Sequence, residues 1–191
     1  MGITSVVVLV LLVLAFGYCV VLYNNLVALK HKLGQAWSNI GVLLKQRNSE
    51  LPKLVETCRQ YMSYEREALE RIVQARAQAM SAHERGDVRG VGESETRMRQ
   101  GLSRLFALAE NYPELKANDA FRQLQSRITD LEEAISDRRE LYNEAVNQNN
   151  TRIEQFPDVL LARVFGFKPA ELLRFSAEET ADVDVKTLFG G

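Results

Sequence analysis

Histidine, cysteine, tryptophan and proline are all scarce in this chain of 191 residues, which has two histidines, two cysteines, one tryptophan and four prolines. Nucleophilic catalysis needs a serine or cysteine beside a base. The two histidines suggest no such pairing, because His31 follows an apolar N-terminal run and His83 precedes a glycine-rich turn. A di-iron bundle would need Glu-x-x-His pairs, and neither histidine has a glutamate three residues before it. We therefore expect no catalytic residues, no metal site and no enzyme activity.

Signals for nucleotide or nucleic-acid binding are also missing. The segment 86–92 (GDVRGVG) is rich in glycine, but it lacks the lysine and the hydroxyl of a Walker A loop. Lysine and arginine number 24 and aspartate and glutamate 25, so the net charge of −1 provides no field that favours a polyanion. We expect no cofactor and no nucleic-acid partner.

The two cysteines, Cys19 and Cys58, are not expected to pair. If both belong to one continuous helix, a rise of about 1.5 Å per residue places them tens of Å apart. A disulfide needs a Cα separation of roughly 6 Å. We interpret both thiols as packing or lipid-facing groups.

Charge is absent from the N-terminal part of the chain. No Asp, Glu, Lys, Arg or His occurs from Met1 to Leu29, and residues 3–22 (ITSVVVLVLLVLAFGYCVVL) are rich in valine and leucine. A helix of about twenty residues spans about 30 Å, the thickness of the hydrocarbon core of a bilayer. Tyr18 and Tyr23, with the two asparagines that follow, suit the far membrane interface. Residues 1–29 are therefore predicted to form a transmembrane anchor.

A cleaved signal peptide is the competing interpretation of this segment. The run is long for the apolar core of a signal, no basic residue precedes it, and no small-x-small site follows it. Lys30 and Lys32 follow the run closely, whereas the first acidic residue is Glu50. The positive-inside rule therefore predicts a retained anchor with a very short N-terminus outside and a cytoplasmic domain.

Beyond the membrane, the apolar residues recur in steps of three and four, which is typical of one helical face. The anchor is thus expected to continue as a helix into the domain, with a kink at Pro52 and no loop there. Glycines at 86, 90 and 92 predict a chain reversal. The apolar stripe of this first helix is Leu22, Leu26, Leu29, Leu33, Trp37, Ile40, Leu44, Leu54, Val55, Cys58, Met62, Leu69, Ile72, Val73 and Ala79.

Three further helices are predicted after the turn. The second helix covers about residues 93–110, and the third covers about 119–154 with Asn118 as its N-cap. Asp158 is expected to cap a short helix over 159–165, which Gly166 ends. Three long helices with one apolar stripe each bury those stripes by packing as an antiparallel bundle, so the predicted fold class is all-α. The domain is assigned to residues 30–169, and 170–191 form an acidic tail.

Several sequence phrases resemble the LemA family of bacterial membrane proteins. They occur in family order along nearly the whole chain after the anchor: Tyr23-Asn24-Asn25-Leu26-Val27, Ala36-Trp37-Ser38-Asn39-Ile40, Leu43-Leu44-Lys45-Gln46-Arg47, Leu51-Pro52-Lys53-Leu54-Val55, Ala75-Arg76-Ala77, the segment 111–118 (NYPELKAN), Tyr142-Asn143-x-Ala145-Val146, Asn150, Phe156-Pro157 and Phe165-Gly166-Phe167. The resemblance implies a single-pass protein of the bacterial inner membrane with an N-terminal transmembrane helix joined to a helical bundle. It implies no enzyme activity. The family often ends in a Pro-x-Val-x-Phe-like tail, which residues 183–189 only approximate.

Two functional classes are favoured by the sequence, and a third, a hydrolase with an unrecognised site, would need a buried polar cleft with perturbed carboxylates. One is a non-enzymatic membrane scaffold or adaptor that self-associates, in contact with the lipid bilayer and with a membrane protein partner. The other is a signalling or protease-associated regulator that acts through the long helix, with Pro52 as a hinge. Trp37 is interpreted as a core residue. The two aromatics of Phe165-Gly166-Phe167 are expected either to plug the end of the bundle or to dock on a neighbouring subunit.

Overall fold

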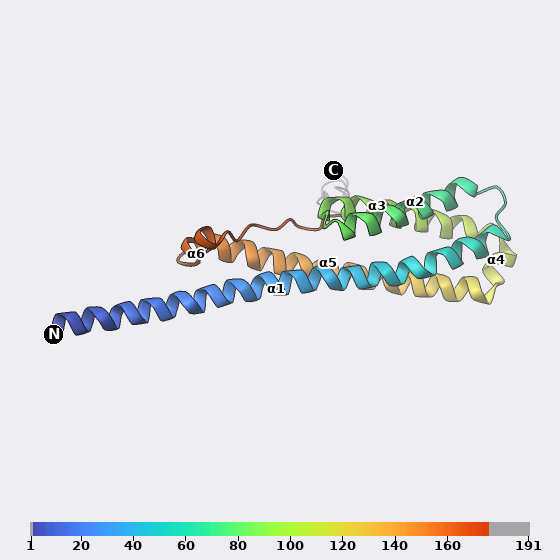
Figure 1. Ribbon diagram of the computed structural model, residues 1–191. Helices are drawn as coiled ribbons and strands as arrows, with labels where there is room; N and C mark the ends of the chain where they lie inside the picture. The colour runs from blue at the N-terminus through green and yellow to red at the C-terminus, as the bar shows by residue number, and fades with distance from the viewer. Residues whose placement is uncertain (1, 176–191) are drawn as a thin grey trace, which may run out of the picture. The chain divides into compact units, whose positions relative to one another are not determined.

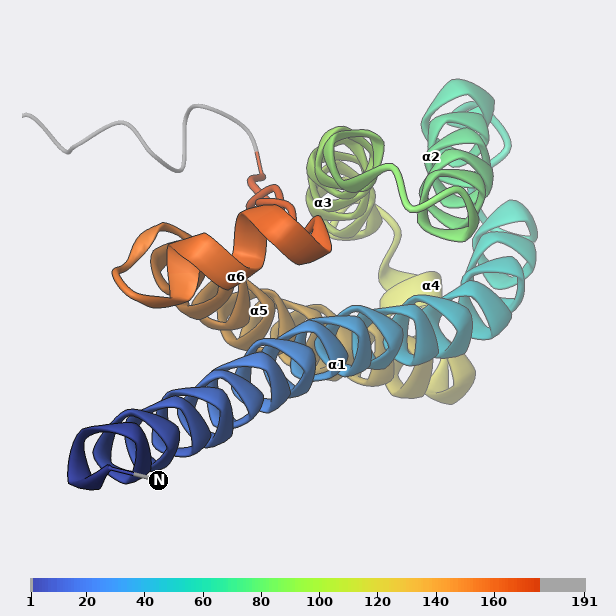
Figure 2. The ribbon, with the colours of Figure 1, turned by 60° about the vertical axis from the view of Figure 1, so that its left-hand side comes forward.

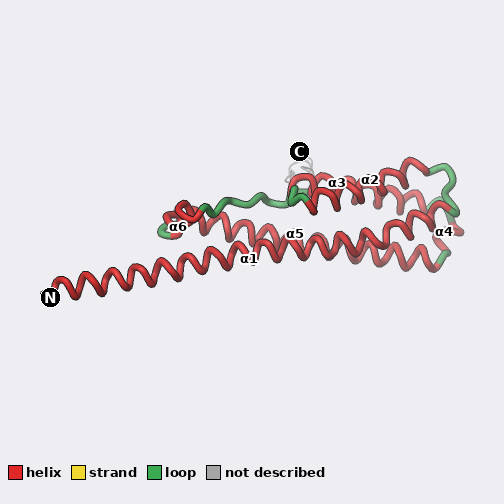
Figure 3. Tube along the Cα trace, in the orientation of Figure 1, coloured by secondary structure: helices red, strands yellow, loops and turns green. Residues whose placement is uncertain are grey.

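The computed structural model describes residues 2–175, and within this range helices, joined by loops and turns, are the only regular secondary structure (Figure 3). The all-α fold class is therefore confirmed. Figure 1 labels the helices in chain order: α1 (Ile3–Arg59), α2 (Arg66–Glu84), α3 (Val88–Ala109), α4 (Pro113–Ala117), α5 (Asp119–Glu154) and α6 (Asp158–Phe165). Most of the acidic tail predicted over 170–191 lies outside the described residues.

The described chain divides into two compact units. The first unit contains residues 2–38 and Glu140–Leu172, and the second contains Asn39–Arg139 and residues 173–175. Helices α1 and α5 contribute to both units, and α6 belongs to the first. Each unit has its own buried apolar cluster, so each is described separately below.

Helix α1 confirms that the apolar N-terminal run continues into the domain without a break. It extends over 57 residues and contains Pro52, so the proline does not end the helix. Leu22, Leu26, Ile40 and Leu44 of the predicted stripe are buried. Pro52 itself is exposed.

The predicted continuation of this helix to the glycine turn was wrong, because the chain leaves the helix after Arg59 and α2 begins at Arg66. Tyrosine and serine, which have low helix propensity, are common in the intervening segment 60–65 (QYMSYE). Tertiary hydrogen bonds hold this turn: the hydroxyl of Tyr112 donates to Glu65 (2.7 Å), and the amide of Asn118 donates to the hydroxyl of Tyr61 (3.1 Å). The bundle therefore has four long helices instead of three.

The second unit contains the helical hairpin of α2 and α3 (Figure 2). Gly86 makes the reversal in the left-handed region at φ 68°, as the sequence predicted. Helix α3 begins five residues earlier than expected, because the Asp87 carboxylate accepts a hydrogen bond from the Gly90 amide (2.8 Å) and caps the helix. A glycine is required at position 92 within α3 for a different reason: a Cβ there would lie 2.1 Å from the carbonyl oxygen of Arg174.

The large apolar core of the second unit takes side chains from α1 to α5. Helix α5 has the predicted bounds, and the Asn118 side chain accepts a hydrogen bond from the Phe121 amide (3.1 Å), which confirms the predicted N-cap. The short helix α4 was not predicted. The buried residues of this core are Leu51, Leu54, Val55, Cys58, Met62, Leu69, Ile72, Ala75, Met98, Leu102, Leu105, Ala109, Leu115, Phe121 and Ile128.

In the first unit, α1 and α5 run antiparallel. The Lys32 ammonium donates to the side-chain oxygen of Gln148 (2.9 Å), and the rings of Trp37 and Tyr142 lie 5.3 Å apart. Residue numbers thus fall along α5 as they rise along α1. Trp37, which was predicted to be a core residue, is only half-buried and packs against Tyr142.

Helix α6 ends as predicted at Gly166, which adopts φ 70°. The predicted capping role of Asp158 was wrong: Asp158 is the first helical residue, and the N-cap position is occupied by Pro157 without a side-chain hydrogen bond. The Asp158 carboxylate is instead buried and forms an ion pair with Arg152 (3.2 Å).

After α6, an extended segment returns along α5. The side-chain oxygen of Asn150 accepts from the Ala170 amide and its amide group donates to the Ala170 carbonyl, both at 2.9 Å. The Tyr142 hydroxyl donates to the carbonyl of Glu171 (3.0 Å). Asn150 and Tyr142 therefore hold the backbone of residues 170–171 against α5.

Candidate functional site

The first functional surface is the apolar face of α1. Every valine and leucine from Val6 to Leu14 is between 50% and 64% exposed, so these side chains have no packing partner within the described residues that covers them. This helix is long and apolar enough to cross a membrane. A continuous apolar surface of this kind is stable only when lipid or another apolar helix covers it.

The histidines and cysteines are not gathered into a reactive site. His31 is exposed, whereas the ring of His83 lies so close to Gly41 that a Cβ there would stand 2.4 Å from its Cε1. Cys19 is exposed on the apolar run, and Cys58 is buried in the second unit. Among residues 2–175, no group of three or more His, Cys, Asp or Glu side chains has an arrangement that holds a metal ion.

A buried charge network lies in the second unit, on positions that the predicted apolar stripes did not include. Both terminal nitrogens of Arg47 donate to Glu95, at 2.8 and 2.5 Å, and one of them also donates to Glu132. Arg99 approaches the other oxygen of Glu132 at 3.4 Å. Arg47 follows Ile40 and Leu44 at helical spacing, which is the signal that could have identified it.

Electrostatics in this network favour the charged arginine. Burial lowers the pKa of Arg47, but the charges and hydrogen bonds of Glu95 and Glu132 offset this effect, and the net pKa is raised. For Glu132, burial raises the pKa although Arg47 and Arg99 lower it. A carboxyl with a raised pKa is a common mark of acid–base catalysis. Here, however, its oxygens are occupied by two arginines, so the network is best explained as a structural link between α1, α3 and α5.

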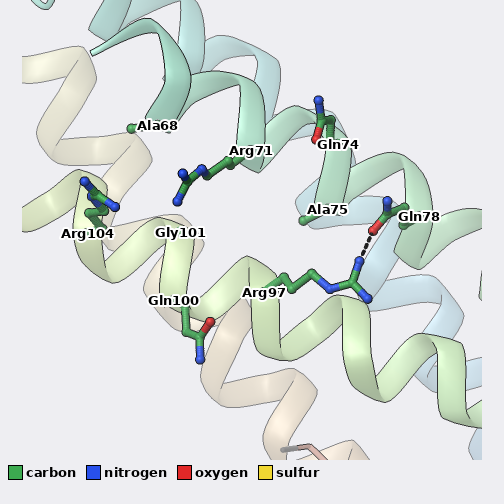
Figure 4. A pocket seen from close by; sticks show the side chains of 9 residues that line it. All are labelled: Ala68, Arg71, Gln74, Ala75, Gln78, Arg97, Gln100, Gly101 and Arg104. Atoms are coloured by element: carbon green, nitrogen blue, oxygen red, sulfur yellow. Dashed lines mark hydrogen bonds between the residues drawn. The ribbon is translucent and has the colours of Figure 1, made fainter.

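A groove between α2 and α3 is the clearest candidate for binding a ligand (Figure 4). It has a volume of about 380 Å³. Its lining combines three arginines and three glutamines with three small residues, Ala68, Ala75 and Gly101. The lining residues are Ala68, Arg71, Gln74, Ala75 and Gln78 on α2, and Arg97, Gln100, Gly101 and Arg104 on α3.

The three arginines of this arginine groove differ in how they are engaged. Arg71 forms an ion pair with Glu67 (2.5 Å), and Arg97 donates to Gln78 (2.7 Å) and forms an ion pair with Glu93 (3.5 Å). Arg104 has no ion pair or hydrogen bond to a side chain within residues 2–175. No acidic side chain lines the groove. The guanidinium groups and the glutamine amides are donors, so the groove is suited to a carboxylate or phosphate group.

These features define a class of protein: a membrane-associated helical bundle in which one long apolar helix is continuous with the folded part. The LemA family matches residues 36–187 of the chain, which is more than half of its length. The chain therefore belongs to the LemA family, as the resemblance of its sequence phrases indicated.

Three related proteins have names that place them in the magnetosome. The chain is 25% identical to magnetosome protein MamQ 2 of Paramagnetospirillum magneticum over 86% of its own length and 68% of the relative. The same figures hold for MamQ 1 of that organism. Identity to MamQ of Magnetospirillum gryphiswaldense is 23%, over 78% of this chain and 63% of that protein.

Proposed function

We propose that this protein is a single-pass scaffold or adaptor of the LemA type, which self-associates in the membrane and has no catalytic activity. The observation that carries the proposal is α1, a single helix of 57 residues whose exposed apolar part is continuous with the helices of a folded bundle. Such a helix fixes the bundle to the bilayer without a flexible linker. Membership of the LemA family and the relatives named as magnetosome proteins support a membrane-associated helical protein.

Self-association is proposed to use the apolar run. Helices associate in lipid by close packing, which is favoured by small residues. Gly17 lies on the exposed run, and a Cβ at this position would meet no atom within 4 Å. A second copy of α1 can therefore approach the backbone of this helix closely.

The adaptor role is proposed to use the arginine groove. Its three arginines present positive charge with donor groups and no lining carboxylate. An acidic segment of a membrane protein partner has the chemistry that this groove recognises. The partner and the scaffold copies would then contact different parts of the chain.

The molar mass of the full-length protein in its native lipid tests both parts of this proposal. The protein is extracted under mild conditions, and the mass is corrected for bound lipid and detergent. We expect a homogeneous assembly that contains a multiple of the chain mass of 21.6 kDa, to which a bound partner adds its own mass. A strictly monomeric protein would contradict self-association.

A groove variant separates the adaptor role from self-association. The triple substitution Arg71→Gln, Arg97→Gln and Arg104→Gln is expected to remove a co-purifying partner and to leave the self-assembled mass unchanged. A matched control replaces three exposed arginines outside the groove, Arg59, Arg122 and Arg138, with glutamine. Loss of the partner in both variants, or in neither, would contradict recognition by the groove.

A regulator that transmits a membrane event through α1 is the second candidate function. Pro52 lies within α1 and lines a small pocket of about 190 Å³ together with Ile72 and Arg76 of α2. A proline removes one helical hydrogen bond and marks a site where α1 can bend. Unchanged signalling or partner turnover in a Pro52→Ala variant would count against this role.

A further inference from the structure

Helix α6 exposes an apolar stripe that neither the proposed scaffold role nor the proposed adaptor role uses. Phe156 is 76% exposed, Leu160 56%, Val164 77% and Phe165 57%. The spacing of four residues places Leu160 and Val164 on one side of α6, and Phe156 lies in the turn directly before this helix. From residue 24 to residue 175, eight large apolar side chains are exposed, and four of them lie in this stretch of ten residues. The α6 stripe is therefore a concentrated surface feature.

The opposite side of α6 is already packed. Ala162 is buried with Leu26 of α1 and Ile153 of α5, and Leu161 and Phe167 pack against this cluster. Rotating α6 to bury the α6 stripe would therefore expose the residues that now pack against α1 and α5. The α6 stripe faces away from the first unit while the inner side of the helix holds α6 in place.

Contacts with α1 place the α6 stripe beside the end of the transmembrane run. The ring of Phe165 lies 4.7 Å from the ring of Tyr23, and Phe167 lies 6.1 Å from the same ring. Tyr23 lies two residues after Val21, at the end of the exposed apolar residues of α1. Figure 1 shows α6 near this part of α1. Aromatic residues at the end of a membrane span are typical of the headgroup region.

Positive charge flanks the same helix. Arg163 lies on α6 and Lys168 follows it, and both are exposed. Helices that lie in a membrane interface combine an apolar face with basic residues, which attract anionic headgroups. The composition of α6 and of its surroundings follows this pattern.

We propose that α6 lies in the headgroup region of the bilayer that α1 crosses, with the α6 stripe inserted into the lipid. This proposal rests on the membrane-spanning part of the proposed function. The bilayer is favoured over a second copy of the chain because the stripe is continuous with the apolar surface of α1. The stripe is also small: its four side chains present on the order of 400–500 Å² if an aromatic side chain offers about 150–250 Å². A standard protein interface needs about 800 Å² on each partner.

Depth-dependent tryptophan quenching tests this placement in the full-length protein. Trp37 is the single tryptophan of the chain, so Trp37→Phe provides a silent background. Leu160→Trp or Val164→Trp then introduces one reporter on the α6 stripe, in vesicles that contain lipids brominated near the headgroup end of the acyl chain. We expect at least a twofold loss of fluorescence for each reporter. Circular dichroism confirms that each variant keeps its helix content.

Two further reporters make the result specific. Leu12→Trp, in the apolar run of α1, reports whether the anchor is in the bilayer, and Val42→Trp is an exposed apolar site that is expected to show no quenching. Quenching at Leu12 but not at the α6 stripe would overturn this inference and leave the anchor intact. Absence of quenching at every reporter, Leu12→Trp included, would overturn both this inference and the proposed membrane anchor. A stripe reporter shielded from bromolipid and from aqueous acrylamide alike would reveal a protein contact and would also overturn the inference.

Discussion

Both terminal nitrogens of Arg47 donate hydrogen bonds to the carboxylate of Glu95: Nη1 lies 2.8 Å from one oxygen and Nη2 lies 2.5 Å from the other. The exposed fractions of the two side chains are only 2% and 1%. A bidentate pair fixes the relative position and orientation of its two groups. In this way Arg47 and Glu95 set the register between α1 and α3 within the second unit.

Substituting one member of this pair is expected to be costly. Arg47→Met leaves the Glu95 carboxylate buried without its partner, and we expect the free energy of unfolding to fall by about 3–5 kcal/mol. The double variant Arg47→Met with Glu95→Gln removes both charges and should recover a large part of this loss. Thermal unfolding followed by circular dichroism in a mild detergent measures the difference.

Arg104→Met is the matched control for the pair, since Arg104 is exposed and forms no ion pair within residues 2–175. It should change the stability by no more than about 0.5 kcal/mol. Equal effects of Arg47→Met and Arg104→Met would show that the buried pair does not stabilise the fold.

Gly92→Ala is predicted to displace the backbone at Arg174. The new Cβ would meet the carbonyl oxygen of Arg174 at 2.1 Å, and backbone cannot move aside as a flexible side chain can. We expect a loss of about 1–3 kcal/mol, as for other overpacked sites, and faster cleavage by trypsin after Arg174. Gly34→Ala is the control, because a Cβ there meets nothing within 4 Å and should stabilise α1 by about 0.5–1 kcal/mol. An unchanged cleavage rate in Gly92→Ala would contradict the close approach.

Alkaline pH is expected to destabilise the protein in part through Cys58. Burial raises the pKa of the Cys58 thiol from 9.0 to about 12 in the folded chain. The unfolded chain loses this proton first, so the stabilising contribution is complete below about pH 9 and is lost as the pH rises towards 12. This group alone changes the free energy of unfolding by up to about 1.4 kcal/mol per pH unit.

The difference between the wild-type protein and a Cys58→Ala variant isolates this contribution. The variant should be less stable at neutral pH because it loses a buried sulfur, but its stability should fall less steeply between pH 9 and 12. Parallel pH profiles of the two proteins would show that the thiol ionises equally well in both states.

Much of the fold could be predicted from the spacing of apolar residues. The bounds of α5 and the glycine at the end of α6 followed from local signals, an N-cap asparagine and a helix-stopping glycine. The break after Arg59 could not be predicted in the same way. Its sequence has no glycine or proline, and tertiary hydrogen bonds from Tyr112 and Asn118 hold the turn.

The candidate sites were harder to predict than the helices. Arg47 and Glu95 each occupy an apolar position of a helical stripe, and a sequence alone does not show that two such exceptions face each other. The arginine groove arises from side chains on two helices that come together only after the chain reverses at Gly86. The exposed apolar stripe of α6 has the same origin, because only the packed structure reveals which side of that short helix is covered.

The most direct test of the proposed function is whether the apolar run of α1 spans the membrane, with its two ends on opposite sides. In a Cys19→Ala background, Gly2→Cys and Ser103→Cys place one exposed thiol before the apolar run and one in the bundle, while Cys58 stays buried. A membrane-impermeant maleimide applied to intact cells is predicted to label the cysteine at position 2 and to reach position 103 only after permeabilisation. Labelling of both positions in intact cells, or of neither until permeabilisation, would contradict a spanning helix with the N-terminus outside.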